Sequence, residues 1–291
     1  MGEDLGSPVR LIRARTLPEG WEKSVIDCWE NGLAFQTQYD RPGDPPSRDT
    51  AMIVDVAQPM AEPRIHRAFP DSLEKLEAYR QEVLHGVHDH WIAPDEGKWQ
   101  YTYHERLFAY DVPGVGVFDQ VERAIERLAA VTYSRRAQAV TWKAWLDADA
   151  EDPACLQRLW FRLDEGDALR LHVHIRSNDA FKAAFMNMYA FTELQQTAAD
   201  ALSERLGRPI AVGRYVHIAD SYHIYGSYFH DFEGFLETVE QRAFEDRVWE
   251  TSFALPFFVE GIDTLLDEPD MPEEKRKLLR PDKARYQAMM T

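Results

Sequence analysis

The sequence predicts an α+β fold, because strands that pair as a hairpin are mixed with long helices. The clearest strand covers residues 169–176, in which every second side chain is apolar: Leu169, Leu171, Val173 and Ile175. The clearest helix covers residues 179–206, in which apolar side chains recur every three or four positions. The chain has 291 residues, of which 45% are hydrophobic, so we expect a sizeable core and a single domain over residues 1–291.

The other elements follow from the same periodicities and from start and stop signals. Further helices are expected at 19–29, 71–84, 118–128 and 235–248. The first of them ends at Asn31-Gly32 and the second at Gly86. Further strands are expected at 51–56, 137–145, 158–163 and 215–218. Residues 40–49 are rich in proline, glycine and aspartate and predict a loop, and residues 267–291 predict a charged, helical tail.

The composition excludes several classes of protein. A formal net charge of −17 argues against binding a nucleic-acid polymer, which needs a basic surface. No apolar run is long enough to span a bilayer, and residues 1–8 lack the basic start and apolar core of a signal peptide. Only two cysteines occur, Cys28 and Cys155, so we expect no disulfide framework and a reducing, cytoplasmic setting.

Cys155 is the candidate nucleophile. It follows a proline in a polar turn, whereas Cys28 lies inside a helix pattern and is expected in the core. Arginines, whose forked guanidinium suits phosphate, occur at Arg135-Arg136 and at Arg176. A cationic group near Cys155 would lower the pKa of its thiol and so activate it. From the residues alone, a buried structural thiol is the alternative.

Several separated motifs follow one another in a fixed order: Arg135-Arg136, Pro153-Ala154-Cys155, Arg176-Ser177-Asn178-Asp179, Phe185-Met186-Asn187 and His223-Ile224-Tyr225. In order and spacing they resemble the thymidylate synthase and pyrimidine-nucleotide hydroxymethylase superfamily, most clearly over residues 131–226. A weaker resemblance precedes them at Glu30-Asn31-Gly32 and Asp40-Arg41-Pro42-Gly43. The resemblance implies a thymidylate-synthase-like α+β fold, in which a large mixed or antiparallel sheet packs on a long central helix. The other sheet face would be buried in a homodimer.

The resemblance implies that Cys155 attacks C6 of a pyrimidine nucleoside 5′-monophosphate. The C5 carbon can then accept a one-carbon unit from 5,10-methylenetetrahydrofolate, the implied co-substrate. The resemblance assigns the 5′-phosphate to four arginines and a serine: Arg41, Arg176 and Ser177, with Arg135 and Arg136 reaching the phosphate bound by the partner subunit. Each active site would therefore be shared between two subunits.

The resemblance also implies roles for residues around the base, the sugar and the cofactor. Asn187 would read the base edge and leans toward uracil, since some relatives that prefer cytosine carry aspartate there. Asp179 would contact the folate pterin, although its position also suits a helix N-cap. The other expected site residues are Trp91 at the cofactor, Tyr103 as the active-site tyrosine, His223 in the water network near O4, and His217 and Tyr225 at the sugar.

Two departures from the family pattern concern proton transfer. Ser221 stands two positions before His223, where the family usually has aspartate. The family's glutamate base has no counterpart at the expected spacing in the helix that ends at Gly86. We predict Glu82 as the general base, with Glu105 as the rival.

The product is expected to be a hydroxymethyl rather than a methyl group. The chain ends in charged residues over 280–286 in place of the family's closing tail, and its 91–99 segment is rearranged. Both features favour hydroxymethylation, because reductive methylation requires that water be excluded. Thymidylate synthesis, a catalytically silent nucleotide-binding relative and a cysteine hydrolase using His172 or His223 are the alternatives. His172 and His174 share a strand face, but spacing fixes no third ligand, so no metal site is expected.

Overall fold

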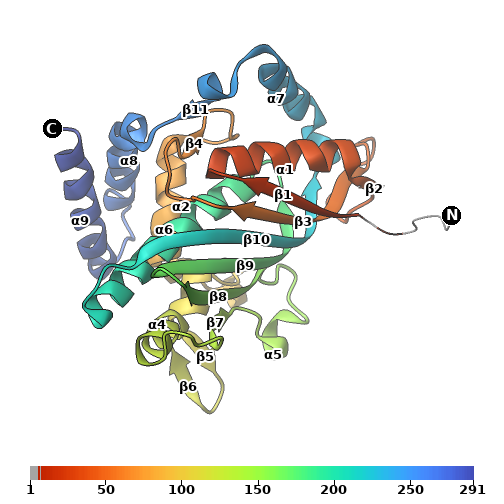
Figure 1. The fold of residues 1–291 in the computed structure, drawn as a ribbon. Coiled ribbons are helices and arrows are strands. Elements are labelled where there is room, and N and C mark those ends of the chain that lie inside the picture. Colours follow the sequence, from red (N-terminus) through yellow and green to blue (C-terminus); the bar gives the residue numbers. More distant parts are fainter. Residues whose placement is uncertain (1–5, 7) are drawn as a thin grey trace.

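The computed structural model describes residue 6 and residues 8–291, and it has the predicted α+β architecture (Figure 1). The described strands form one mixed seven-stranded sheet in the order β1-β3-β10-β9-β8-β7, with β2 paired to β3. Their bounds are β1 (Val9–Ala14), β2 (Leu33–Phe35), β3 (Ser47–Val56), β7 (Ala137–Val140), β8 (Leu156–Asp164), β9 (Ala168–Asp179) and β10 (Ala211–Ile224). β1 runs parallel to β3 and β10 parallel to β9, whereas the other pairs are antiparallel.

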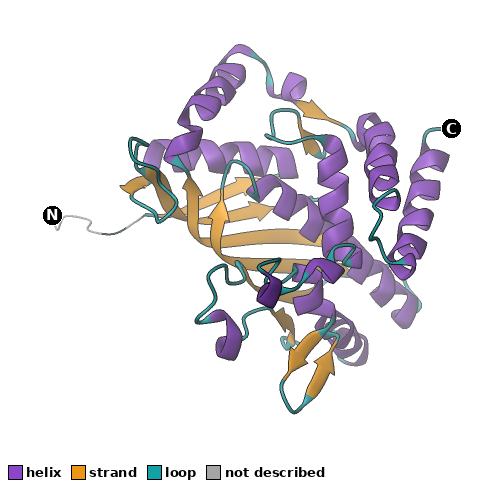
Figure 2. Cartoon of the chain, turned by 180° about the vertical axis from the view of Figure 1, so that it is seen from behind, coloured by secondary structure: helices purple, strands orange, loops and turns teal. Residues whose placement is uncertain are grey.

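Two short strand pairs lie outside this sheet: β4 (Ile65–His66) with β11 (Val248–Trp249), and β5 (Tyr110–Val112) with β6 (Gly116–Phe118). The α-helices are α1 (Leu17–Asn31), α2 (Leu73–His85), α3 (Tyr103–Phe108), α4 (Gln120–Ala130), α5 (Ala144–Asp147), α6 (Ala184–Leu206), α7 (Phe229–Gln241), α8 (Thr251–Leu266) and α9 (Glu273–Met289). Seen from the back, α6 and α2 lie in front of the sheet (Figure 2), with α2 packed on α6 and α8. None of the described helices combines the length and the apolar character needed to cross a membrane.

The central helix α6 follows the predicted pattern over most of its length. Its apolar stripe is buried in the core: Phe185, Met188, Phe191, Leu194, Ala198 and Leu202. It ends at Gly207, whose φ of 63° is the left-handed conformation that glycine adopts without strain. It starts later than predicted, because residues 180–183 form a turn. The Asp179 carboxylate stabilises that turn by accepting hydrogen bonds from the backbone N–H groups of Phe181 and Lys182 at 3.0 and 2.8 Å.

The other predicted elements are present, with several shifted bounds. The helix predicted at 235–248 runs over 229–241 instead. It stops early because Arg247 turns into the core, where its guanidinium donates hydrogen bonds to both carboxylate oxygens of Glu22 at 2.7 Å. The strand predicted at 137–145 ends at Val140, and the loop predicted at 40–49 is shorter because residues from Ser47 onward pair with β2 and β10.

The two faces of the sheet differ in character. On β9, the apolar set Leu171, Val173 and Ile175 is fully buried beneath α6, whereas Arg170, His172 and His174 are half-buried on the opposite face. Figure 1 shows β8, β9 and β10 in front of α6, with the second face toward the viewer. The sheet therefore has one face that forms the core and one face without a helix layer over β8 to β10.

Candidate active site

A cavity of about 490 Å³ lies where the carboxyl ends of the parallel strands β9 and β10 meet the start of α6. Its walls include residues from six parts of the chain: Phe35 to Tyr39 and Asp49; Tyr103; Asp152 and Cys155; Arg176 to Asp179; Ala183 and Asn187; and Ser221, His223 and Tyr225. Because parallel strands end at one edge of a sheet, the motifs at the ends of β9 and β10 lie side by side. This cavity contains most of the residues that the sequence singled out.

Cys155 lies just before β8, and hydrogen bonds of its backbone N–H and carbonyl groups fix its position. Its N–H donates to the Tyr101 hydroxyl at 3.3 Å, and its carbonyl accepts from the N–H of Arg176 at 2.8 Å. Burial raises the pKa of the Cys155 thiol above its ordinary value, while the charge of Arg176 and the Tyr101 hydroxyl lower it in part. The Arg176 charge acts in the expected direction, but burial outweighs it. Cys28 is fully buried in the core, as predicted.

The expected phosphate residues fall into two groups. Arg176 and Ser177 line the cavity, and the Arg176 guanidinium donates to the carbonyls of Pro153 and Ala154 at 2.6 and 3.1 Å, which ties it to the loop that carries Cys155. Arg41 lies outside, on the wall of an adjoining cavity of about 460 Å³ that also includes Tyr225. Arg135 and Arg136 are exposed just before β7 and do not line the Cys155 cavity of their own chain.

His223 reaches a carboxylate through Ser221, although its family-type aspartate is missing. The Ser221 hydroxyl donates to Asp49 at 2.5 Å, and its oxygen lies 3.1 Å from His223 Nδ1. Asp49 is the cross-strand neighbour of His223 on β3, so the carboxylate comes from a different strand. Since the single Ser221 proton goes to Asp49, Nδ1 of His223 carries the proton that Ser221 accepts, and Nε2 is an acceptor. Nε2 is buried without a protein partner among the described residues.

His217 does not line the cavity, contrary to its predicted place at the sugar. It is fully buried in β10, with Nε2 at 2.8 Å from Asn178 Oδ1 and Nδ1 at 3.0 Å from the Tyr215 hydroxyl. Burial lowers the pKa of His217 to about 3 and that of His223 to about 4, so both rings are neutral at pH 7. His217 orients Asn178, which does line the cavity.

Asp179 and Asn187 both lie on the cavity wall, as expected. Burial raises the pKa of Asp179 to about 6, although the backbone donors of Phe181 and Lys182 lower it in part. The same carboxylate therefore caps the turn before α6 and faces the cavity. Asn187 is 6% exposed and accepts a hydrogen bond from the Tyr79 hydroxyl on α2, a contact that the sequence did not indicate.

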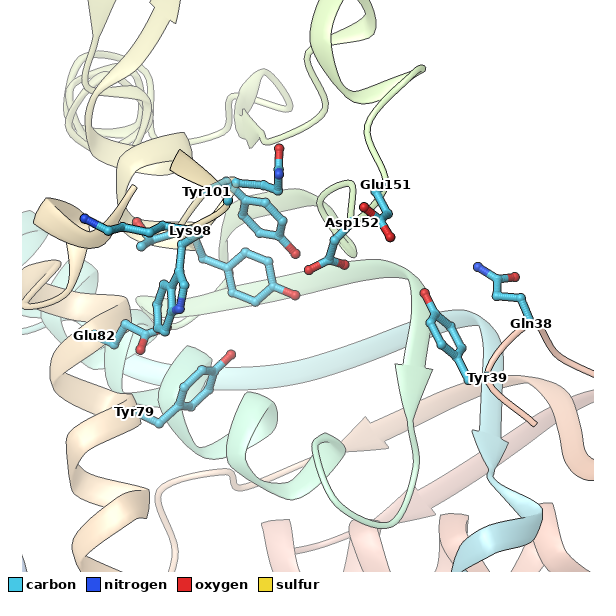
Figure 3. Close-up of a pocket in the computed structure, with 13 residues that line it drawn as sticks. Gln38, Tyr39, Tyr79, Glu82, Lys98, Tyr101, Glu151 and Asp152 are labelled. Atoms are coloured by element: carbon cyan, nitrogen blue, oxygen red, sulfur yellow. The ribbon is translucent and has the colours of Figure 1, made fainter. Parts of the chain in front are cut away.

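A second cavity, of about 1090 Å³ (Figure 3), adjoins the first and shares Gln38, Tyr39, Tyr103 and Asp152 with it. Its aromatic residues are Tyr39, Tyr79, Trp99, Tyr101 and Tyr103. Glu82 also lines it and is held by His88 Nδ1 at 3.0 Å, so the predicted base lies on this cavity rather than among the residues lining the Cys155 cavity. Its size and aromatic wall suit a flat heterocyclic ligand.

Two other predictions concern this region. Trp91 lines neither cavity, because its indole N–H donates to Asp270 at 3.0 Å and its ring stacks on His88 at 3.9 Å; Trp99 lines the wall instead. Glu105 accepts from Lys143 at 2.7 Å, which engages the rival base in an ion pair. In the part of the chain that the structure describes, no group of three or more His, Cys, Asp or Glu residues could hold a metal ion.

A thiol, a guanidinium, an amide and a neutral imidazole around one cavity are the groups expected of an enzyme that holds a small anionic ligand beside a nucleophile. A family model described as thymidylate synthase matches residues 72–247, and the chain belongs to this family of one-carbon transferases. A protein of Methanopyrus kandleri named "Putative thymidylate synthase" is 30% identical over 67% of this chain and 85% of its own length. A protein of the same name from Methanococcoides burtonii is 28% identical over 74% of this chain and 89% of its own.

The fold of the chain is also similar to that of a solved thymidylate synthase. The structure of thermostable thymidylate synthase A from Bacillus subtilis aligns with a TM-score of 0.57 at 17% identity, over 75% of this chain and 83% of that one. The family uses 5,10-methylenetetrahydrofolate as its co-substrate. The family match ends at residue 247, so α8 and α9 lie beyond it.

Proposed function

We propose that this enzyme transfers a one-carbon unit to C5 of a pyrimidine nucleoside 5′-monophosphate through a covalent bond between Cys155 and C6. The observation that carries the proposal is the convergence of Cys155, Arg176, Ser177, Asn187 and Tyr225 on one cavity. These groups supply a nucleophile, an anion site, a base-edge reader and a hydroxyl for the sugar. A silent binder would not need the thiol. A cysteine hydrolase would need a histidine in contact with the thiol, and among the described residues Cys155 has no hydrogen bond to a histidine.

The 5′-phosphate is assigned to Arg176 and Ser177, with Arg41 brought in from the neighbouring loop. Arg135 and Arg136 are exposed and do not line the Cys155 cavity of their own subunit, which supports a role across a homodimer. The half-buried sheet face that carries His172 and Trp160 offers a surface for that dimer. In this arrangement each subunit donates two arginines to its partner's phosphate.

The reaction begins with attack of the Cys155 thiolate on C6, which makes C5 a carbon nucleophile. The co-substrate supplies the methylene carbon when bound. Removal of the C5 proton and loss of tetrahydrofolate leave an exocyclic methylene on the pyrimidine. Addition of water to that carbon, with release of Cys155, gives a 5-hydroxymethyl nucleotide. We assign the proton removal to Glu82, acting with water across the shared wall of the two cavities.

Hydroxymethylation is favoured because the larger cavity is wide and polar. Lys98, Glu151 and Asp152 line it together with Glu82, and charged side chains favour a hydrated cavity. No described residue after Tyr225 lines either of these two cavities, so the C-terminal helices do not exclude water from them. Reductive methylation to thymidylate is the second candidate, favoured by the names of the relatives in the two archaea.

The test is product mass after incubation with 5,10-methylenetetrahydrofolate and each of dUMP, dCMP, UMP and CMP. A gain of a hydroxymethyl group with one nucleotide is expected, and a gain of a methyl group would select the second candidate. The Cys155→Ala variant should lose product and lose exchange of the C5 hydrogen with solvent, while Cys28→Ala serves as the thiol control. Absence of product and of C5 exchange with every nucleotide would refute the proposed function.

A further inference from the structure

Tyr79 on α2 contacts the residue expected to read the base. Its hydroxyl lies 2.5 Å from Asn187 Oδ1, between two helices that pack on each other. Tyr79 also lines the larger cavity, on whose wall Tyr101 lies as well (Figure 3). Glu82 lies one turn further along the same helix but is engaged by His88. Tyr79 therefore connects α2 to a residue that lines the Cys155 cavity, here called the nucleotide cavity.

The contact with Tyr79 involves one end of the Asn187 amide. The Tyr79 hydroxyl donates to Oδ1 of Asn187, so the carbonyl oxygen of the amide faces Tyr79 and the NH2 group faces away from it. The Asn187 NH2 group has no hydrogen-bond partner among the described residues, and the side chain lines the Cys155 cavity. Two amide donors are consequently available to a ligand.

Tyr79 stays a donor over the working pH range. Burial raises the pKa of Tyr79 well above its ordinary value, and the nearby groups Glu82, Tyr101, Cys155 and Tyr215 add to the rise. A neutral phenol has one proton, and Asn187 is the side chain that accepts it. The orientation of the amide is therefore fixed by a group outside the nucleotide cavity.

We propose that Tyr79 is a positioning residue that locks the Asn187 amide with its NH2 toward the nucleotide and thereby selects a 4-oxo over a 4-amino pyrimidine. The inference rests on the proposed function, because it assumes that Asn187 meets the base edge. A uracil offers the O4 acceptor to the NH2 group and its N3–H to the second lone pair of Oδ1. A cytosine places its amino group against the amide NH2, which leaves buried donors unpaired.

The test compares the affinity of dUMP with that of dCMP by calorimetric titration, repeated with UMP and CMP. The wild-type enzyme should bind the uracil nucleotide more tightly, and Tyr79→Phe should reduce the uracil-to-cytosine affinity ratio about ten-fold, because the freed amide can flip. Tyr189→Phe is the matched control. Tyr189 is buried on the same helix as Asn187, and its hydroxyl has no hydrogen bond to that amide within the described structure. The control should keep the wild-type ratio.

A second variant tests the inference if Tyr79→Phe does not fold. In Asn187→Asp, one carboxylate oxygen accepts from Tyr79 and the other faces the ligand as an acceptor, so the preference should reverse to cytosine. An unchanged ratio in Tyr79→Phe, or a persistent uracil preference in Asn187→Asp, would overturn the role of Tyr79 and leave the proposed function standing. If the wild-type enzyme bound none of the four nucleotides, the proposed function would fail with it.

Discussion

Replacing His217 by glutamine should make the fold less sensitive to acid. His217 is fully buried and uses both ring nitrogens, with Asn178 accepting from Nε2 and Tyr215 donating to Nδ1. A second ring proton would break the bond from Tyr215 and bury a charge. Glutamine offers one donor and one acceptor over a similar length, but it does not titrate.

The magnitude follows from the pKa of His217, which burial lowers to about 3. The unfolded chain has a histidine pKa of about 6.5, so below that pH the unfolded state binds a proton that the folded state does not. The stability supplied by the neutral ring is therefore complete above pH 6.5 and is lost as the pH falls toward 3. Between pH 7 and pH 5 the loss amounts to about 2 kcal/mol, and it reaches about 3 kcal/mol by pH 4.

Urea unfolding at pH 7, 6 and 5 measures this loss. The wild-type free energy of unfolding should fall by about 2 kcal/mol more than that of His217→Gln over this range. The substitution also has a fixed effect, which cancels because only the change with pH is compared. His223, whose pKa burial lowers to about 4, titrates in both proteins and cancels as well. Equal pH slopes for the two proteins would refute the reasoning.

Three further outcomes are expected. Ser221→Ala should weaken nucleotide binding about five- to ten-fold in titrations, because His223 loses the contact that fixes its tautomer; unchanged affinity would contradict the Asp49–Ser221–His223 chain. Alkylation of Cys155 by iodoacetamide should accelerate about ten-fold per pH unit from 7 to 8.5, since burial raises the pKa of that thiol, and a plateau below pH 7 would argue against it. Asp282→Asn should reduce the free energy of unfolding by about 1–3 kcal/mol in urea titrations by weakening the contact of α9 with Arg80, and no change would show that α9 is held by apolar packing alone.

The sequence predicted the part of the site that is formed by motifs at the ends of strands. Arg176 to Asp179 close β9 and His223 closes β10, and these strands are parallel neighbours, so their ends meet by topology. Cys155 is placed beside them because its carbonyl pairs with Arg176 across β8 and β9. Residues that share one edge of one sheet are predictable from their order along the chain.

The missed residues reach the site by packing between distant segments. Asp49 lies in a stretch that composition assigned to a loop, and only the pairing of β3 with β10 places it beside Ser221. Tyr79 reaches Asn187 because α2 packs on α6, and the spacing within α2 gives no indication of which residue faces that helix. The periodicity of a single segment does not indicate such contacts, because they depend on how segments far apart in the sequence pack on one another.

The C-terminal helices explain how α2 can hold Tyr79 in place. Asp282 on α9 accepts hydrogen bonds from Arg80 and Gln81 at 2.8 Å, and the Tyr286 hydroxyl donates to Glu77 at 3.0 Å. On α8, a Cβ at Gly261 would lie 2.6 Å from the carbonyl oxygen of Glu74, so only glycine allows this close approach to α2. These helices follow the part of the chain that matches the family, and they brace the helix that carries Tyr79 and Glu82 instead of covering the cavities. If α8 and α9 closed over the site, these buried contacts would be lost, which supports the proposed addition of water at the reacting carbon.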